Sequence, residues 1–191
     1  MNRRKAIARI LLFGGAGAAI AGGASYYHFN KKPDLLDLDQ YVPLIAELAE
    51  VIIPETDTPG AKSAGVHDFI VTMIRDCSSR KVQNRFLYGL EDVASYARTQ
   101  YNKSFVHCSK EDKAAIVAHF EKKSRPWEGL MGKISSRLFG DSFFMTLKKY
   151  TVMGYCTSMQ GATRAMAYEY IPGRYQGCIP LQPGQRCWAT E

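Results

Sequence analysis

Apolar residues recur every three or four positions along most of the chain between residues 37 and 155. This spacing is typical of an amphipathic α-helix, which turns once every ~3.6 residues. The pattern predicts five helices, near residues 37–54, 66–77, 80–101, 109–120 and 141–155. No long segment alternates apolar and polar residues as a half-buried strand would. We therefore expect a single all-α domain.

Proline, glycine and capping residues set the limits of these helices. Pro54 ends the first helix, because proline cannot donate the next backbone hydrogen bond. The loop that follows, Pro54–Lys62, is dense in turn-forming residues. Ser109 is a good N-cap for the fourth helix, and Asp112 occupies the third position after it, in a relative of the capping box.

The last twenty-one residues have a different character. Prolines and glycines in 171–191 exclude a helix, yet apolar side chains of buried type remain: Tyr175, Ile179, Leu181 and Trp188. Such a segment packs along a surface, either of its own domain or of a partner. We expect three regions: a leader (1–32), a helical domain (33–170) and an irregular tail (171–191).

The leader has the three-part layout of an export signal. Arg3, Arg4 and Lys5 precede an uncharged run from Ile10 to Tyr27, after which polar and basic residues follow. The adjacent arginines indicate the twin-arginine route to the periplasm. Glycines weaken the run as a helix, by about 1 kcal/mol each relative to alanine. An anchor in the inner membrane is the alternative, since the run approaches the ~20 residues that a span requires.

Charge argues against a nucleic-acid partner. The chain carries a formal charge of +7, but six of its 25 basic residues lie in residues 1–32, which contain no Asp or Glu. The other 19 basic side chains are balanced by 18 acidic ones. A nucleic-acid-binding protein needs a standing basic face to displace counterions.

The sequence contains little that points to chemistry on this chain. Its five cysteines include no C-x-x-C pair, which excludes a thioredoxin-like motif, a paired-cysteine zinc site and covalent haem attachment. The four histidines are not at metal-ligand spacing. Glu55 and Asp57 fit turn residues better than an acid–base pair. We expect no catalytic, metal or cofactor residue here. Two alternatives stay open: a cofactor-free enzyme using a Cys–His pair formed in space, and a stand-alone membrane-anchored scaffold.

Two long blocks resemble the gluconate 2-dehydrogenase subunit 3 family. They are LIAELAEVIIPETDTPGAKSAGVHDFI, from Leu44 to Ile70, and GYCTSMQGATRAMAYEYIPGRYQGCIPL, from Gly154 to Leu181. In the second block the family typically reads Gly-Tyr-Phe-Thr-Ser, so Cys156 stands where phenylalanine is usual. The resemblance covers nearly the whole chain, including the leader.

The resemblance implies a non-catalytic small subunit of a membrane-associated, FAD-dependent sugar or polyol dehydrogenase. The expected partner is a large flavoprotein of the glucose–methanol–choline type that binds FAD, with a cytochrome subunit as a further candidate partner. The small subunit is expected to help the flavoprotein mature and to carry it through the twin-arginine route. A flavin inserted in the cytoplasm requires export of a folded protein, which suits that role.

The resemblance also suggests a disulfide. Cys77 and Cys178 match family positions, and their pairing would tie the second helix to the tail. By the chain-entropy model a loop of about 100 residues closed in this way is worth ~4 kcal/mol. The runner-up is a bond between Cys178 and Cys187.

Two segments are predicted to face the flavoprotein. One is the loop Thr56–Lys62, with Thr56, Asp57, Thr58, Pro59 and Gly60 as its interface residues. The other lies in the tail, where Arg174 and Tyr175 are of types enriched at binding hot spots. The alternative for the tail is that Arg174 pairs with Glu169 and Tyr175 fills the core of this domain.

The export hypothesis predicts the behaviour of an Arg3→Lys, Arg4→Lys double variant. The change keeps the charge but removes the paired guanidinium groups. We expect this chain and its flavoprotein both to stay in the cytoplasm, as measured by immunoblotting of cell fractions. Normal dehydrogenase activity in the periplasm of the variant would contradict the hypothesis.

Overall fold

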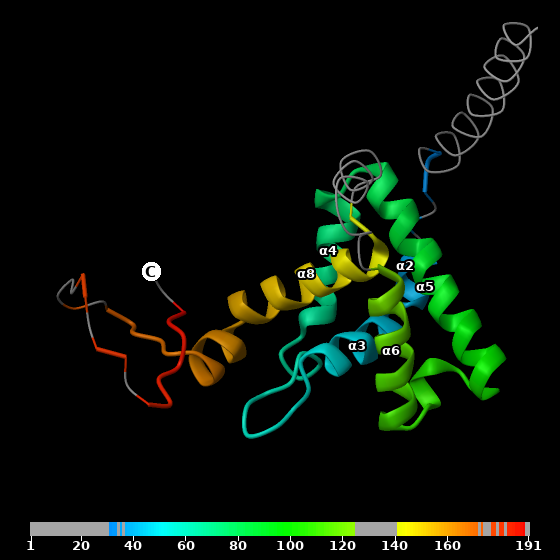
Figure 1. Ribbon diagram of the computed structural model, residues 1–191. Coiled ribbons are helices and arrows are strands. Elements are labelled where there is room, and N and C mark those ends of the chain that lie inside the picture. Colours follow the sequence, from blue (N-terminus) through cyan, green and yellow to red (C-terminus); the bar gives the residue numbers. More distant parts are fainter. Residues whose placement is uncertain are drawn as a thin grey trace, which may run out of the picture.

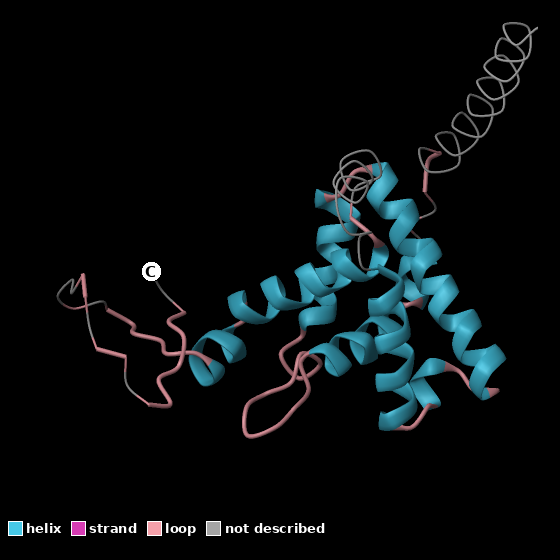
Figure 2. Cartoon of the chain, in the orientation of Figure 1, coloured by secondary structure: helices cyan, strands magenta, loops and turns pink. Residues whose placement is uncertain are grey.

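The computed structural model describes residues 31–33, 35, 37–124, 141–171, 173, 177–178, 180–181 and 183–189. These residues are helical and form no strand (Figure 2). Their five long helices are α3 (Val42–Ile52), α4 (Val66–Cys77), α5 (Arg80–Tyr101), α6 (Lys110–Ser124) and α8 (Phe143–Thr157). The short elements are α2 (Asp37–Gln40), the 3₁₀ turn η1 (Phe105–His107) and the π-helical turn η2 (Gly161–Ala165). The predicted all-α class is confirmed.

Helix α8 lies at the centre of the packing. It contacts all four of the other long helices, and Figure 1 shows it crossing the body of the protein. Its inner face buries Phe143, Phe144, Leu147, Thr151 and Tyr155. The other helices contribute large buried side chains to the same core: Ile45, Leu48, Ile70, Ile74, Phe86, Leu90 and Ile116. Burial of apolar surface at about 25 cal/mol per Å² stabilises this arrangement.

Helix ends are capped by local side chains and backbone. Ser109 Oγ accepts a hydrogen bond from the backbone N–H of Asp112 at 3.1 Å, which confirms the predicted cap. Ser142 caps α8 in the same way, through the N–H of Met145 at 3.4 Å. Helix α5 ends at Asn102, which takes the left-handed conformation (φ 52°) and donates to the carbonyl of Arg98.

The first predicted helix is wrong in its bounds. Instead of one helix over 37–54, the chain forms α2 and α3 with a break at Tyr41. Pro43 lies in the first turn of α3, where a backbone N–H would have no hydrogen-bond acceptor within the helix, so proline costs nothing there. In the middle of a longer helix the same proline would remove a hydrogen bond. Helix α3 ends at Ile52, just before Pro54 and the loop.

Among the residues that the structure describes, no helix is both long and apolar enough to cross a membrane. The predicted leader, with Arg3 and Arg4, lies outside the described residues.

The close approach of α5 to α8 generates a stability prediction. A Cβ built on Gly89 would fall inside van der Waals contact with Cβ and Cγ of Phe143, atoms that cannot swing away. Gly89→Ala should therefore lower the free energy of unfolding by about 1–3 kcal/mol, as overpacking does, despite the better helix propensity of alanine. Urea denaturation followed by circular dichroism measures the change.

The matched control is Gly173→Ala, because nothing lies within 4 Å of a Cβ at that exposed position. Its unfolding midpoint should match that of the wild type. A Gly89→Ala variant as stable as the wild type would contradict the close packing of α5 on α8.

Candidate partner-binding site

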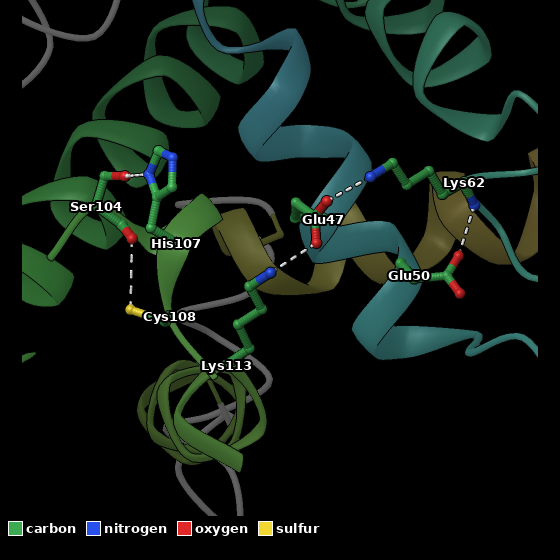
Figure 3. Close-up of polar contacts among 7 residues, drawn as sticks. All are labelled: Glu47, Glu50, Lys62, Ser104, His107, Cys108 and Lys113. Atoms are coloured by element: carbon green, nitrogen blue, oxygen red, sulfur yellow. Dashed lines mark hydrogen bonds and ion pairs between the residues drawn. The ribbon is translucent and has the colours of Figure 1, made fainter. Parts of the chain in front are cut away.

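The loop between α3 and α4 is closed by the carboxylate of Glu50. This carboxylate accepts hydrogen bonds from the backbone N–H groups of Glu55 and Lys62, each at 2.8 Å, one at each end of the loop. Figure 3 shows the bond to Lys62. The N–H of Ala61 also donates to the carbonyl of Ile53 at 2.9 Å. Hydrogen bonds to an ionised acceptor are roughly twice as strong as neutral ones, so Glu50 holds the loop in one shape.

The predicted interface residues lie within this closed loop. A Cβ on Gly60 would meet the carboxyl group of Glu50, so a larger residue there would displace that carboxylate. The carbonyl of Pro59 accepts a hydrogen bond from Tyr155 Oη of α8 at 2.6 Å. The N–H of Thr56 donates to the carbonyl of Thr58 at 3.0 Å. The loop therefore presents a fixed backbone with exposed side chains at its tip.

Glu47, one turn before Glu50 on α3, anchors the loop a second time. Its carboxylate pairs with Lys62 at 2.5 Å and with Lys113 of α6 at 2.8 Å (Figure 3). Burial by itself raises the pKa of Glu47, but the hydrogen bonds from Lys113 and Lys62 outweigh it and leave that pKa below its usual value. The pKa of Lys62 is raised by its hydrogen bond to Glu47. One carboxylate thus joins α3, α6 and the loop.

A hollow of about 280 Å³ lies between the loop and the turn that follows α8. Its walls come from the loop residues 55–59, Ser63, Gln160 and Arg164. Four of the five predicted loop residues, Thr56–Pro59, line it. The carboxylates of Glu55 and Asp57 and the guanidinium of Arg164 make it polar. It is open to solvent, so a partner's side chain can enter it.

In the part of the chain that the structure describes, large exposed apolar side chains lie from Met145 onward. Among the described residues they are Met145, Val152, Met153, Met159, Tyr168, Tyr170, Ile171, Leu181 and Trp188. Four of these are more than 70% exposed, namely Met159, Tyr170, Ile171 and Leu181. A contiguous exposed apolar surface on a folded protein marks an interaction site.

Helix α8 carries part of this exposed set on one stripe, which we call the outer face of α8. Met145, Lys149, Val152 and Cys156 recur at helical spacing and are all exposed. Lys148 and Met153 lie at the edges of the stripe. The sequence analysis missed this face. The sequence feature that could have identified it is the presence of apolar residues on both sides of α8, as in a helix that is buried all round.

The tail extends beyond the end of α8, away from the helical body (Figure 1). It folds back on itself: the N–H of Ala167 donates to the carbonyl of Cys187, and the N–H of Ala189 donates to the carbonyl of Ala167, each at 2.8 Å. Arg186 also donates to the carbonyl of Arg164 at 2.7 Å. The described apolar residues of the tail stay exposed. Arg174 and Tyr175 lie outside the described residues.

All five cysteines are free thiols in this structure. Cys77 and Cys178 are both exposed and unpaired, and so is Cys187. Cys77 ends α4, whereas the start of α4 is the end that meets the C-terminal half of α8, where Gly154 faces Phe69. The tail continues from that C-terminal end. The Cys77–Cys178 bond therefore requires the tail to turn back along α4, and it stays a prediction.

The neighbouring His107 and Cys108 form no Cys–His pair with each other. His107 Nδ1 is hydrogen-bonded to Ser104 Oγ at 2.7 Å, and the buried thiol of Cys108 donates to the backbone carbonyl of Ser104 at 3.5 Å (Figure 3). His107 and Cys108 thus bond to different groups of Ser104, its hydroxyl and its backbone carbonyl. Within the described ranges, no group of three or more His, Cys, Asp or Glu is arranged to hold a metal ion.

A second hollow, of about 600 Å³, lies between α3, α5 and η1. Glu91 and Arg98 are its charged residues, and no histidine or cysteine lines it. It therefore does not contain the Cys–His pair on which the enzyme alternative rests.

Comparison with known protein families identifies the family to which this chain belongs. The model of the family described as gluconate 2-dehydrogenase subunit 3 matches residues 39–173, which include the loop, α8 and η2. The chain belongs to this family of dehydrogenase-complex subunits. No curated protein and no solved structure matches the chain.

The Glu47 anchor generates a prediction about acid stability. A carboxyl group with a depressed folded-state pKa stabilises the fold above its unfolded pKa of about 4.5, and this contribution is lost as the pH falls through the folded pKa. Glu47→Gln should lower the free energy of unfolding at pH 7 by about 1–3 kcal/mol, because it leaves the partly buried Lys113 without its counter-charge. The loss should shrink at pH 3.

Urea denaturation at the two pH values measures this difference. Glu91→Gln, at an exposed position of α5, is the control and should behave as the wild type at both. If the destabilisation by Glu47→Gln is the same at pH 3 and pH 7, the carboxylate does not act through its charge.

Proposed function

We propose that this chain is the non-catalytic small subunit of a periplasmic, membrane-associated, FAD-dependent sugar or polyol dehydrogenase. The observation that carries the proposal is the exposed apolar surface on α8 and the tail of a chain that belongs to a family of dehydrogenase subunits. A surface of this kind is costly in water and is stabilised when a partner covers it. The proposed partner is a large flavoprotein of the glucose–methanol–choline type.

The flavoprotein carries the chemistry in this proposal. It binds FAD and removes hydride from the substrate, and a cytochrome subunit is a candidate acceptor of the electrons. The small subunit binds the loaded flavoprotein in the cytoplasm, assists its maturation and provides the twin-arginine signal at Arg3 and Arg4. If the leader is not cleaved, it would also hold the complex at the inner membrane.

The proposed contact includes the loop Thr56–Gly60 and the tail residues Arg174 and Tyr175. Glu50 and Tyr155 hold the loop before a partner arrives, so little conformational entropy is lost when it binds. The hollow beside Arg164 offers both signs of charge to a polar side chain of the partner.

Co-purification tests the proposal directly. The tagged full-length chain, expressed in its organism of origin, should recover a larger protein with the absorbance spectrum of an oxidised flavin, and substrate addition should bleach that spectrum. Arg174→Ala with Tyr175→Ala should reduce the recovered flavin while the helical signal of the small subunit stays intact. Recovery of the pure chain with no flavoprotein, or sugar oxidation by the isolated chain, would contradict the proposal.

A further inference from the structure

Helix α8 has an apolar inner face and also carries exposed apolar residues, together with Lys149, on its outer face. The outer side of α5, for comparison, exposes Glu91, Asp92, Ser95, Arg98 and Thr99. A helix that is apolar all round is stable when it is covered all round. The core covers the inner face of α8. Its outer face, with Met145 at 45%, Val152 at 44% and Met153 at 38% exposure, is left uncovered by the described residues and is open to a second cover.

The distribution of charge along the chain indicates the chemistry of the surface that would pack on the outer face of α8. Residues 142–191 contain five basic residues and two acidic ones, whereas residues 33–141 contain fourteen basic and sixteen acidic. The basic excess thus falls on the part of the chain with the exposed apolar side chains. On α8 itself Lys149 is exposed beside Val152 and Met145, whereas its neighbour Lys148 pairs with Glu121 of α6 at 3.2 Å. A complementary surface is apolar in its middle and acidic at its edge.

We propose that the outer face of α8 docks into an apolar groove with an acidic rim on the dehydrogenase subunit. This inference rests on the proposed function and assigns its interface to a surface outside the predicted loop and tail residues. Methionine is enriched in the buried middle of protein interfaces, and its flexible side chain fills irregular gaps. Recognition of one apolar helix face in a groove is a recurrent mode of binding.

The turn after α8 connects the helix to the loop hollow. Met159, 79% exposed, follows the end of the helix, and the next residue, Gln160, lines the hollow together with Arg164. The hollow therefore begins one residue beyond Met159 in the chain.

Two other covers fit the observations less well. An interfacial membrane helix presents bulky Trp, Phe or Leu to the lipid, whereas the outer face of α8 presents Met and Val. A second copy of this chain packed on the same face would bring Lys149 against Lys149, and like charges at an interface repel. An acidic groove of a different subunit satisfies both the apolar and the basic residues.

The test uses a matched pair of charge reversals in the tagged full-length chain. Lys149→Glu reverses a charge on the outer face of α8, and Lys122→Glu makes the same change at an exposed position of α6. Val152→Asp removes the apolar middle of the face. We expect Lys149→Glu and Val152→Asp each to lower the recovered flavin by about tenfold, because both mismatch the groove. Lys122→Glu should recover as much flavin as the wild type.

Unchanged helical signals and unfolding midpoints in all three variants would show that the fold is intact. A variant that unfolds is replaced by the double variant Met145→Gln with Met153→Gln, which keeps the helix. If the wild type recovers flavoprotein and the α8 variants recover it equally well, the α8 inference is wrong and the proposed function stands. If the wild type recovers none, both are wrong. Wild-type binding to anionic vesicles, or a dimer of the chain alone, that Lys149→Glu abolishes would also overturn the inference.

Discussion

The structure depends on the packing of α8 through the middle of the helical body. This helix contacts α3, α4, α5 and α6, so each of them is positioned by the side chains of its inner face. Two glycines permit the approach: Gly89 of α5 leaves room for the Phe143 ring, and Gly154 of α8 leaves room for Phe69 of α4. Because α8 is held on that side, its outer face is exposed on this chain.

The same helix organises the loop. Tyr155 on the inner face of α8 reaches the carbonyl of Pro59, while Glu50 and Glu47 of α3 hold the loop from the other side. The loop is therefore fixed by three long-range contacts to helices that are themselves packed together. A binding surface built on such a scaffold needs little ordering when a partner arrives.

The helical class and most helix limits followed from the sequence because they depend on local rules. The spacing of apolar residues identified the five long helices, and Ser109 was recognisable as a cap from its neighbours. The break between α2 and α3 was missed, since Tyr41 continues the apolar spacing and the effect of Pro43 in a first turn was not weighed. Pro43 at the second position of α3 is itself a local signal of that break.

The anchoring of the loop could not be predicted in the same way. Glu50 resembles any polar residue of an amphipathic helix, and its role appears only when the chain brings Lys62 back to it. The outer face of α8 was hidden for a related reason. The spacing of Met145, Val152 and Met153 does not tell which side of an apolar helix meets the core, and only the packed structure separates the two faces.

Oxidative footprinting of methionine tests most directly whether a partner covers this surface. Mild peroxide converts exposed methionines to sulfoxides, which mass spectrometry locates. In the isolated chain Met145, Met153 and Met159 should oxidise quickly, and in the co-purified complex Met145 and Met153 should be protected while half-buried Met73 of α4 is unchanged. Equal oxidation of Met145 and Met153 in the free chain and in the complex would contradict the account, because the outer face of α8 would then remain bare in the assembly.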